Sequence, residues 1–336
     1  MGGDHRERRQ LAGVGETQDR SRQAAGPPGP LLLAGPTAVG KSAIALLLAE
    51  RIGGEIVSVD SMQVYRGMDI GTAKASPADR ARVPHHLIDV VEVSEPFDAA
   101  HFVQLARRAV AEIEGRGRVP ILCGGTGLYF KAYLEGLGAA PAADAALRAA
   151  LEAVPLPELL RELAERDPAT YERVDRQNPR RVVRALEVIR LTGRPFSAQR
   201  AEWVHATPGT QYAANCFGLA RSREELHQRI SARVDAMFRQ GWVAETEQLL
   251  QRGLAQNKTA MQALGYRQIV EHLRGERSLA ETVELVKART RQFARRQMTW
   301  FRRQLQLRWI SLEGRNSSEA VSELIAAVGA VATAGR

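Results

Sequence analysis

The segment that most constrains the fold is residues 35–42, which read Gly35-Pro36-Thr37-Ala38-Val39-Gly40-Lys41-Ser42 and fit the pattern G-x-x-x-x-G-K-[ST]. An apolar run typical of a buried strand precedes them, and a helical pattern follows over residues 42–52. Such a loop points backbone N–H groups at an anion, and the N-terminus of the helix adds positive charge. The segment therefore predicts a site for a di- or triphosphate, but it does not say which one.

Strand and helix patterns alternate after this loop. Residues 55–60 form a second apolar run, residues 99–114 an amphipathic helix, and residues 119–123 a third strand. This alternation is typical of a doubly wound parallel sheet, because each crossover between parallel strands needs a helix. We therefore predict an α/β fold of the P-loop type.

The pattern changes near residue 138, and no strand pattern appears from there to about residue 210. Asn178-Pro179 predicts the start of a helix over residues 180–191, and Gly193 its end. We therefore predict an α-helical insertion domain within the sheet domain. The expected organisation is a disordered extension (1–29), the first part of the core (30–138), the helical insertion (139–210), the second part of the core with a returning strand at 216–219 (211–315), and a C-terminal helix or tail (316–336).

Charge and cysteine content limit the class of protein. The net charge of +9 favours a polyanionic partner but says nothing about chemistry. Cys123 and Cys216 lie far apart, which disfavours a disulfide framework or a zinc site. No apolar run is long enough to span a bilayer, and residues 1–30 lack the core of a signal peptide. We therefore expect a cytoplasmic protein without a membrane partner.

The acidic residue Asp60 ends the second predicted strand. Since the carboxyl ends of parallel strands meet at one crevice, Asp60 and the phosphate loop should face a common pocket. A purely structural role, in which Asp60 caps the next turn, is equally compatible with its position. Lys74 could serve an anion or lie solvated in a loop, and the pair His85-His86 favours a structural role over a metal site.

Three function classes fit these features. An NTPase usually places a carboxylate after another buried strand, but residues 119–123 run into Gly124-Gly125-Thr126-Gly127 without an acid. That omission disfavours an NTPase and leaves a P-loop kinase of a small metabolite open. An RNA-binding protein with an inactive loop is a further alternative, against which the intact Lys41, Ser42 and Asp60 weigh.

A long basic segment near the C-terminus favours contact with nucleic acid. No acidic residue lies between Leu285 and Leu312, and apolar side chains recur every seven residues at Val286, Phe293, Trp300 and Leu307. This spacing predicts a helix with one buried face and one basic face. Such faces are often merely solvated, but the interleaved aromatic residues favour contact with a phosphate backbone.

Seven segments in order along residues 30–310 resemble the tRNA dimethylallyltransferase family. They are the phosphate loop, Asp60-Ser61 with Gln63-Val64-Tyr65, Gly67–Lys74, Gly124–Tyr129, Arg184–Glu187, Gly265–Gln268 and Arg295–Trp300. The resemblance implies a P-loop core with a helical insertion. Residues 1–29 have no counterpart in the family pattern, and the zinc-finger extension of some eukaryotic members is not seen, which indicates the bacterial form.

The resemblance also implies an activity. It is transfer of the dimethylallyl group from dimethylallyl diphosphate to N6 of the adenine beside the anticodon, at position 37 of tRNA, with release of diphosphate. The loop then holds the leaving diphosphate where related proteins bind nucleotide, and ATP is not a reactant. A monomer that binds Mg²⁺ and grips the anticodon arm is expected.

Residue roles follow from the same resemblance. Asp60 would be the general base and Thr126 a supporting catalytic residue. Gly35, Pro36, Thr37, Ala38, Val39, Gly40, Lys41, Ser42 and Arg223 would hold the diphosphate, with Ser42 also on the metal. The flipped adenine should lie near Asp60. The full set expected to bind tRNA is Asp60, Ser61, Met62, Gln63, Thr126, Arg148, Arg180, Arg181, Val182, Val183, Arg184, Gln262, Ala263, Leu264, Gly265, Tyr266, Arg267, Arg295, Arg296, Gln297, Met298, Thr299, Trp300, Phe301 and Arg302.

Overall fold

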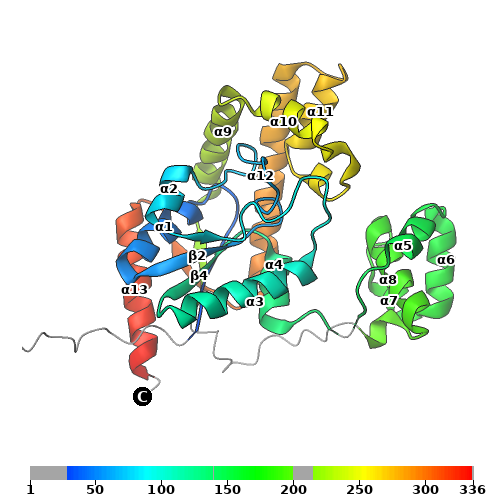
Figure 1. The fold of residues 1–336 in the computed structure, drawn as a ribbon, viewed down its shortest axis with the longest axis horizontal. Coiled ribbons are helices and arrows are strands. Elements are labelled where there is room, and N and C mark those ends of the chain that lie inside the picture. The colour runs from blue at the N-terminus through cyan, green and yellow to red at the C-terminus, as the bar shows by residue number, and fades with distance from the viewer. Residues whose placement is uncertain (1–28, 139, 200–214, 335–336) are drawn as a thin grey trace, which may run out of the picture.

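A six-stranded sheet forms the centre of the molecule (Figure 1). The computed structural model describes residues 29–138, 140–199 and 215–334. The strand order is β3-β2-β4-β1-β5-β6, and every pairing between neighbouring strands is parallel. The prediction of a doubly wound parallel sheet is confirmed.

The strands at the middle of the sheet agree with the apolar runs of the sequence. These are β1 (Leu31–Ala34), β2 (Gly54–Val59), β4 (Val119–Gly124) and β5 (Cys216–Ala220). The edge strands β3 (His85–His86) and β6 (Arg308–Ser311) were not predicted. β3 has only two residues and β6 is largely exposed, so neither carries the apolar signal of a buried strand.

Helices cover both faces of the sheet. α1 (Lys41–Ile52) connects β1 to β2, and α3 (Ala99–Gly115) leads from beyond β3 into β4. These two connections run in opposite directions across the sheet, so right-handed crossovers place α1 and α3 on opposite faces. α13 (Ser317–Ala334) packs beside α1, and α4 (Gly127–Glu135) packs beside α3. The remaining helix of this half, α2 (Pro77–Arg82), is short and follows the capping residue Ser76.

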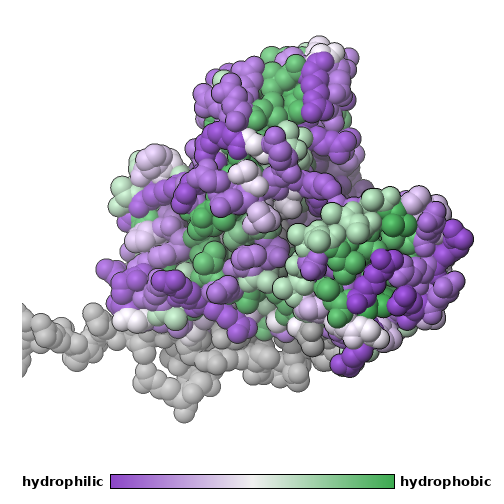
Figure 2. Space-filling model, turned by 45° about the vertical axis from the view of Figure 1, so that its right-hand side comes forward, coloured by the Kyte–Doolittle hydropathy of each residue, from purple (hydrophilic) through white to green (hydrophobic). Residues whose placement is uncertain are grey.

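Residues 140–199 are helical, and their helices form a lobe beside the core (Figures 1 and 2). The lobe contains α5 (Ala145–Glu152), α6 (Leu156–Arg166), α7 (Pro168–Arg173), α8 (Pro179–Thr192) and a 3₁₀ turn (Phe196–Ala198). As predicted, Asn178 caps α8 by accepting from the Arg181 N–H, and Gly193 ends it in the left-handed conformation. The lobe has its own apolar core, to which α5, α6 and α8 contribute.

Four helices follow β5. They are α9 (Arg223–Arg239), α10 (Trp242–Gln251), α11 (Tyr266–Leu273) and α12 (Leu279–Gln304), with 3₁₀ turns at Leu254–Gln256 and Ala260–Gln262. α12 begins with a reciprocal capping box between Ser278 and Glu281. It packs against α4, α9 and α11 and so joins the two halves of the core.

The predicted seven-residue repeat in α12 is wrong in part. Phe293 is 38% exposed, and Leu307 lies beyond the end of the helix. The buried positions are Thr282, Val286, Ala294, Gln297 and Phe301, with spacings of three, four and eight. A straight helix turns every 3.6 residues, so a strict spacing of seven drifts off one face.

The N-terminal extension, the end of the insertion and the absence of a membrane span were also predicted. Residues 1–28 of the predicted extension lie outside the described residues. So do residues 200–214, which contain the end of the insertion predicted over 139–210 and the start of the predicted second part of the core. Among the described helices, none is both long and apolar enough to cross a membrane.

Candidate active site

A cavity of about 510 Å³ lies at the carboxyl ends of the central strands. Lys41 and Ser42 line it from the phosphate loop, Asp60 from the end of β2, and Thr126 from the end of β4. The structure therefore brings the expected base, phosphate ligands and supporting residue to one place. The further lining residues are Thr37, Ser61, Met62, Gln63, Gly71, Thr72, Ala73, Cys123, Gly124, Gly125, Arg233, Val234, Met237, Trp242, Gln262, Ala263, Leu264, Arg267, Gln268, Arg289, Thr290, Gln292, Phe293, Arg296 and Gln297.

The phosphate loop has the curled shape that its glycines predict. Gly40 has a φ of 111°, a backbone conformation that residues other than glycine rarely adopt. α1 begins at the next residue. The Lys41 ammonium group donates to the Pro36 carbonyl at 2.8 Å. Burial lowers the pKa of Lys41 to about 8, while Cys123 raises it and the nearby Arg233 lowers it. A bound anion would reverse this effect of burial.

Arginines of the β5–α9 region surround the phosphate loop. Arg221 donates to the Val39 carbonyl at 2.8 Å, and Arg229 donates to the Ala38 carbonyl at 2.9 Å. Arg233, one turn further along α9, lines the cavity, and burial lowers its pKa. Arg223 is exposed at the start of α9 and does not line the cavity. The four-residue spacing from Arg229 to Arg233 was a sequence signal for one helical face.

Asp60 performs a structural task and also faces the cavity. Its Oδ1 accepts from the backbone N–H groups of Met62, at 2.8 Å, and Gln63, at 3.3 Å. Its Oδ2 makes no hydrogen bond with any residue that the structure describes. The two alternatives for Asp60 are therefore compatible, because one oxygen holds the turn and the other remains available to a ligand.

Thr126 connects the ends of β4 and β2. Its hydroxyl accepts from the Ser61 backbone N–H at 3.1 Å and lies 3.4 Å from the Ser61 hydroxyl. Gln63 braces the same turn, since its side chain accepts from Ser58 at 2.8 Å and donates to the Thr72 carbonyl at 3.1 Å. These contacts fix the backbone on both sides of Asp60.

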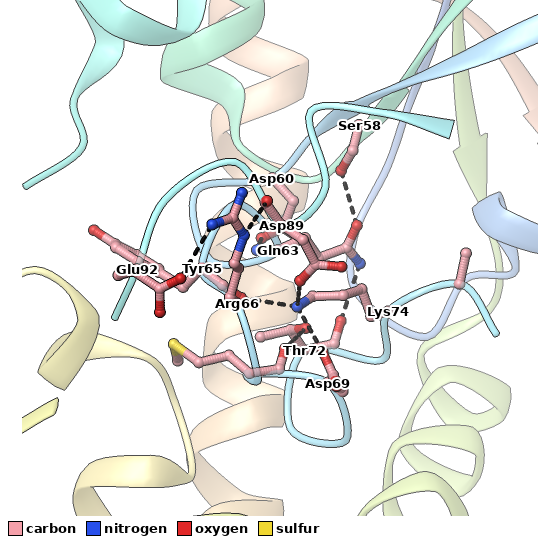
Figure 3. Close-up of polar contacts among 12 residues, drawn as sticks. Ser58, Asp60, Gln63, Tyr65, Arg66, Asp69, Thr72, Lys74, Asp89 and Glu92 are labelled. Carbon is pink, nitrogen blue, oxygen red and sulfur yellow. Dashed lines mark hydrogen bonds and ion pairs between the residues drawn. The ribbon is translucent and has the colours of Figure 1, made fainter. Parts of the chain in front are cut away.

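Residues 60–63 and 71–73 line one side of the cavity, and we call the segment 60–91 to which they belong the wall. Lys74 anchors this wall (Figure 3). The Lys74 side chain is only 2% exposed. Its ammonium group donates to the Asp69 carboxylate at 2.6 Å, the Asp89 carboxylate at 2.6 Å and the Tyr65 carbonyl at 2.8 Å. Lys74 is thus neither solvated nor directed at a ligand. Its three donors are all used to hold the wall together.

Glu245 of α10 anchors the same wall from outside, a role that no pattern in the sequence predicted. Its carboxylate accepts from three consecutive backbone N–H groups, those of Asp69, Ile70 and Gly71. The Tyr266 hydroxyl also donates to it, at 2.6 Å. Tyr266 is therefore buried as a support for the wall, and burial raises its pKa far above the usual value.

The histidine pair has the structural role that we expected. His86 contacts Glu55 at 2.7 Å, and Arg116 donates to the same carboxylate at 2.7 Å. Within the described part of the chain, no group of three or more His, Cys, Asp or Glu side chains could hold a metal ion.

A bound Mg²⁺ would need oxygen ligands beside the phosphate loop. Ser42 and Asp60 line the same cavity as the phosphate loop, and both present oxygen atoms. Mg²⁺ commonly takes one or two protein ligands and completes its shell with phosphate oxygens and water. The oxygen atoms of these residues fit such a site.

α12 contributes Gln297 to the inner part of the site. This side chain is 8% exposed and lies between the phosphate loop and the loop after β4. The glycines of that second loop allow close packing. A Cβ atom on Gly124 would lie 2.0 Å from the Val59 carbonyl, and one on Gly127 would lie 2.2 Å from the Trp300 ring. The Gly-Gly-Thr-Gly sequence is thus explained by tight contact with β2 and α12.

The residues expected to bind tRNA lie in different environments. Arg295, Arg296, Thr299 and Arg302 are exposed on α12, and a second hollow of about 630 Å³ lies beside Arg295, Arg303 and Trp300. Gln262, Ala263, Leu264 and Arg267 line the main cavity. On the same helix, Met298 is half-buried and Phe301 is buried. Gly265 is buried under Trp242, where a Cβ atom would lie 2.0 Å from the ring.

In the insertion, most of the expected tRNA ligands have structural contacts. Val182 and Val183 are buried in the apolar core of the lobe. Arg148 and Arg184 both donate to the buried Glu187 carboxylate, at 2.6 and 2.7 Å. Arg180 and Arg181 are exposed, and Arg180 donates to the Lys258 carbonyl at 3.0 Å. The insertion thus touches the core at the loop that precedes Gln262.

Comparison with known proteins decides the family. A sequence profile described as IPP transferase matches residues 63–304. The chain belongs to the tRNA dimethylallyltransferase family. It is 49% identical over 292 residues to the tRNA dimethylallyltransferase of Geobacter metallireducens, covering 86% of this chain and 94% of that protein. The corresponding identity to the Pelotomaculum thermopropionicum protein is 44% over 301 residues, or 88% and 95% of the two chains.

Solved structures of the family share the fold. The tRNA isopentenylpyrophosphate transferase of Bacillus halodurans is similar with a TM-score of 0.66 and 37% identity, over 91% of this chain and 98% of that one. A eukaryotic dimethylallyltransferase acting on tRNA is similar with a TM-score of 0.68 and 26% identity, over 87% and 75%. The family predicted from the ordered motifs is therefore confirmed, and the family likeness favours a transferase over the kinase alternative.

Proposed function

We propose that the protein transfers the dimethylallyl group of dimethylallyl diphosphate to N6 of the adenine at position 37 of tRNA and releases diphosphate. One observation carries the proposal: Asp60, Lys41, Ser42 and Thr126 line a single cavity beside the exposed basic face of α12. A cavity with a phosphate loop and a carboxylate, open to a basic surface, suits a diphosphate donor and a nucleic-acid acceptor.

The acceptor needs help from a base. The adenine N6 amine is a weak nucleophile, because its lone pair is delocalised into the ring. It must lose a proton as the new C–N bond forms, and the Oδ2 atom of Asp60 is the proposed acceptor of that proton. The Asp60 Oδ1 atom meanwhile keeps its bonds to the Met62 and Gln63 amides, so the base stays oriented. Since base pairing and stacking would hide N6, the adenine must leave its stack to reach Asp60.

The leaving group needs positive charge. As the C–O bond breaks, negative charge grows on the diphosphate, and Lys41 and Arg233 supply charge at that end of the cavity. The backbone N–H groups of the phosphate loop supply further donors. When bound, Mg²⁺ would neutralise part of the diphosphate charge, with the Ser42 hydroxyl as its protein ligand. Arg223 lies outside the cavity, so Arg233 replaces it in this proposal as the arginine beside the diphosphate.

The anticodon arm would lie against α12 and the insertion. Exposed arginines on α12, together with Arg180 and Arg181 of the insertion, suit contacts with the phosphate backbone. We expect the enzyme to act in the cytoplasm as a monomer.

One assay tests the proposal against the kinase alternative. The protein is incubated with labelled dimethylallyl diphosphate, Mg²⁺ and unmodified tRNA, with and without ATP. Label should enter the tRNA at an adenine, ATP should have no effect, and a tRNA with guanine at position 37 should stay unlabelled. No label in RNA would contradict the proposal, and phosphoryl transfer from ATP to a small metabolite would favour the kinase.

A further inference from the structure

The side chain of Gln297 connects the two loops that form the inner end of the cavity. Its Oε1 atom accepts from the Thr37 backbone N–H at 2.8 Å, and its Nε2 atom donates to the Gly125 carbonyl at 2.9 Å. Thr37 belongs to the phosphate loop, and Gly125 to the loop that carries Thr126. Gln297 itself comes from α12, which lies 260 and 172 residues away along the chain.

The geometry around Gln297 shows a close fit. A Cβ atom on Gly125 would lie 2.5 Å from the Gln297 Nε2 atom, so no larger residue fits there without displacing the amide. The side chain is 8% exposed, and both of its polar atoms are satisfied by backbone groups. A neutral amide can accept at one atom and donate at the other in this position without a change of protonation.

These contacts limit what the Thr37 amide can do. In a phosphate loop the backbone N–H groups point at the anion, but the Thr37 N–H is already occupied by Gln297. The diphosphate is therefore left to the amides nearer α1 and to Lys41. Gln297 fixes the first turn of the loop instead, so the loop is held in place before the anion arrives.

We propose that Gln297 is a positioning residue that holds the phosphate loop against the Gly125–Thr126 loop, and so fixes the distance between the leaving group and Asp60. The identity of the transferred group in this inference rests on the proposed function. The contact between the two loops does not depend on that function. In this role Gln297 acts through the backbone and does not touch tRNA, although it lies on the helix with the basic face.

The test replaces Gln297 by methionine, which keeps the length of the side chain and removes both hydrogen bonds. Gln297→Glu keeps the acceptor for Thr37 but sets a carboxylate against the Gly125 carbonyl. We expect Gln297→Met to lower kcat/KM for dimethylallyl diphosphate about ten- to a hundred-fold, since two hydrogen bonds are lost. The dissociation constant for tRNA should change less than about two-fold, because the tRNA face of α12 is intact.

Direct binding separates this inference from the proposed function. Affinity for inorganic diphosphate with Mg²⁺, measured by calorimetry, should fall in Gln297→Met whether or not the enzyme prenylates tRNA. Gln251→Met, at an exposed site on α10 outside the cavity, is the matched control and should change neither constant. The inference is overturned if Gln297→Met loses tRNA affinity with normal diphosphate affinity, or if folded Gln297→Met protein has wild-type constants throughout. If the wild-type protein transfers no prenyl group, the proposed function fails while the diphosphate measurement still decides the role of Gln297.

Discussion

The two oxygens of Asp60 have separate tasks, and this makes the choice of substitution important. Oδ1 holds the turn by accepting from Met62 and Gln63, and Oδ2, which makes no hydrogen bond with any described residue, is the proposed base. Alanine would remove both tasks at once. Asparagine keeps an oxygen for the turn and removes only the basic atom.

Asp60→Asn should therefore keep its fold and its affinity for tRNA but lose turnover by at least about 100-fold, the usual contribution of a general base. Single-turnover prenylation and tRNA binding measure the two effects. Asp98→Asn is a matched control, because Asp98 Oδ1 likewise accepts from two backbone amides, those of Ala100 and His101, at the start of α3. Wild-type turnover in Asp60→Asn would remove Asp60 from the role of base.

Lys41 makes diphosphate binding depend on pH. Burial lowers its pKa to about 8 in the free protein, and a bound diphosphate raises the pKa again by supplying opposite charge. The bound state thus holds the proton more tightly than the free state. Affinity should be highest below pH 8 and should fall as the pH rises through about 8 and above.

Calorimetry at several pH values, in buffers of different ionisation enthalpy, should show this fall together with proton uptake on binding above pH 8. Lys41→Arg provides the control, because a guanidinium group stays charged over this range and should flatten the profile. An unchanged slope in Lys41→Arg would assign the pH dependence to another group.

At the scale of elements, local patterns predicted the centre of the site, and long-range contacts completed it. The phosphate loop and Asp60 were predictable, because each follows a buried strand within a few residues. The contacts of Glu245, Arg233 and Gln297 were not, since nothing in their own helices indicates which loop they meet. Glu245 contacts amides about 175 residues away, and an isolated sequence gives no information about such pairs. The apolar spacing of α8 predicts that Val182 and Val183 are buried. The family resemblance instead implied that they bind tRNA together with the neighbouring arginines.

Helix α8 illustrates how a basic cluster can be structural. The Glu187 side chain is fully buried and accepts from Arg148, Arg184 and the Asp144 backbone N–H. Burial would raise the pKa of Glu187, but the hydrogen bonds from the two arginines outweigh it and hold the pKa below its usual value. Arg184 also donates to the Pro141 carbonyl at 2.6 Å, which attaches the entry of the insertion to α8.

Glu187→Ala should loosen the insertion without reaching the diphosphate site. Removing the carboxylate leaves two arginines without their partner, at a cost of about 2 kcal/mol, because both are partly exposed and can regain water. Hydrogen exchange should rise in α5–α8 and stay unchanged in β1, β2 and β4. Glu112→Ala, which breaks the exposed pair with Arg108, is the control and should leave exchange unaltered.

At the scale of the whole molecule, the basic surface and the cavity lie on the same helix. Arg296 lines both hollows, whereas Arg295 and Arg303 line only the outer one. The acceptor's backbone can therefore bind outside while its base enters inside. The net charge of +9 attracts a polyanion over long range, and the basic face of α12 orients that polyanion toward the cavity.

Salt should reveal which arginines meet phosphate. Each lost phosphate contact should lower the slope of log Kd against log salt by about 0.7 to 1. We expect this change for Arg303→Gln and no change for the control Arg108→Gln on α3. The Arg108 side chain is exposed and pairs with Glu112, and it lies far from α12 along the chain. Filter binding of tRNA at several salt concentrations measures both slopes. Equal slopes for the two variants would remove α12 as the backbone contact.

The wall formed by residues 60–91 has a further consequence. It contains little regular structure, yet Lys74 and Glu245 together hold three backbone amides, two carboxylates and a carbonyl of this segment. A segment held by so many side-chain bonds keeps its shape, unlike the loosely held loops that open and close over many enzymes. A designed inhibitor would therefore meet a preformed surface on this side. Its chemistry could be matched to that surface in advance, and any adjustment on binding would fall to the side chains of α12.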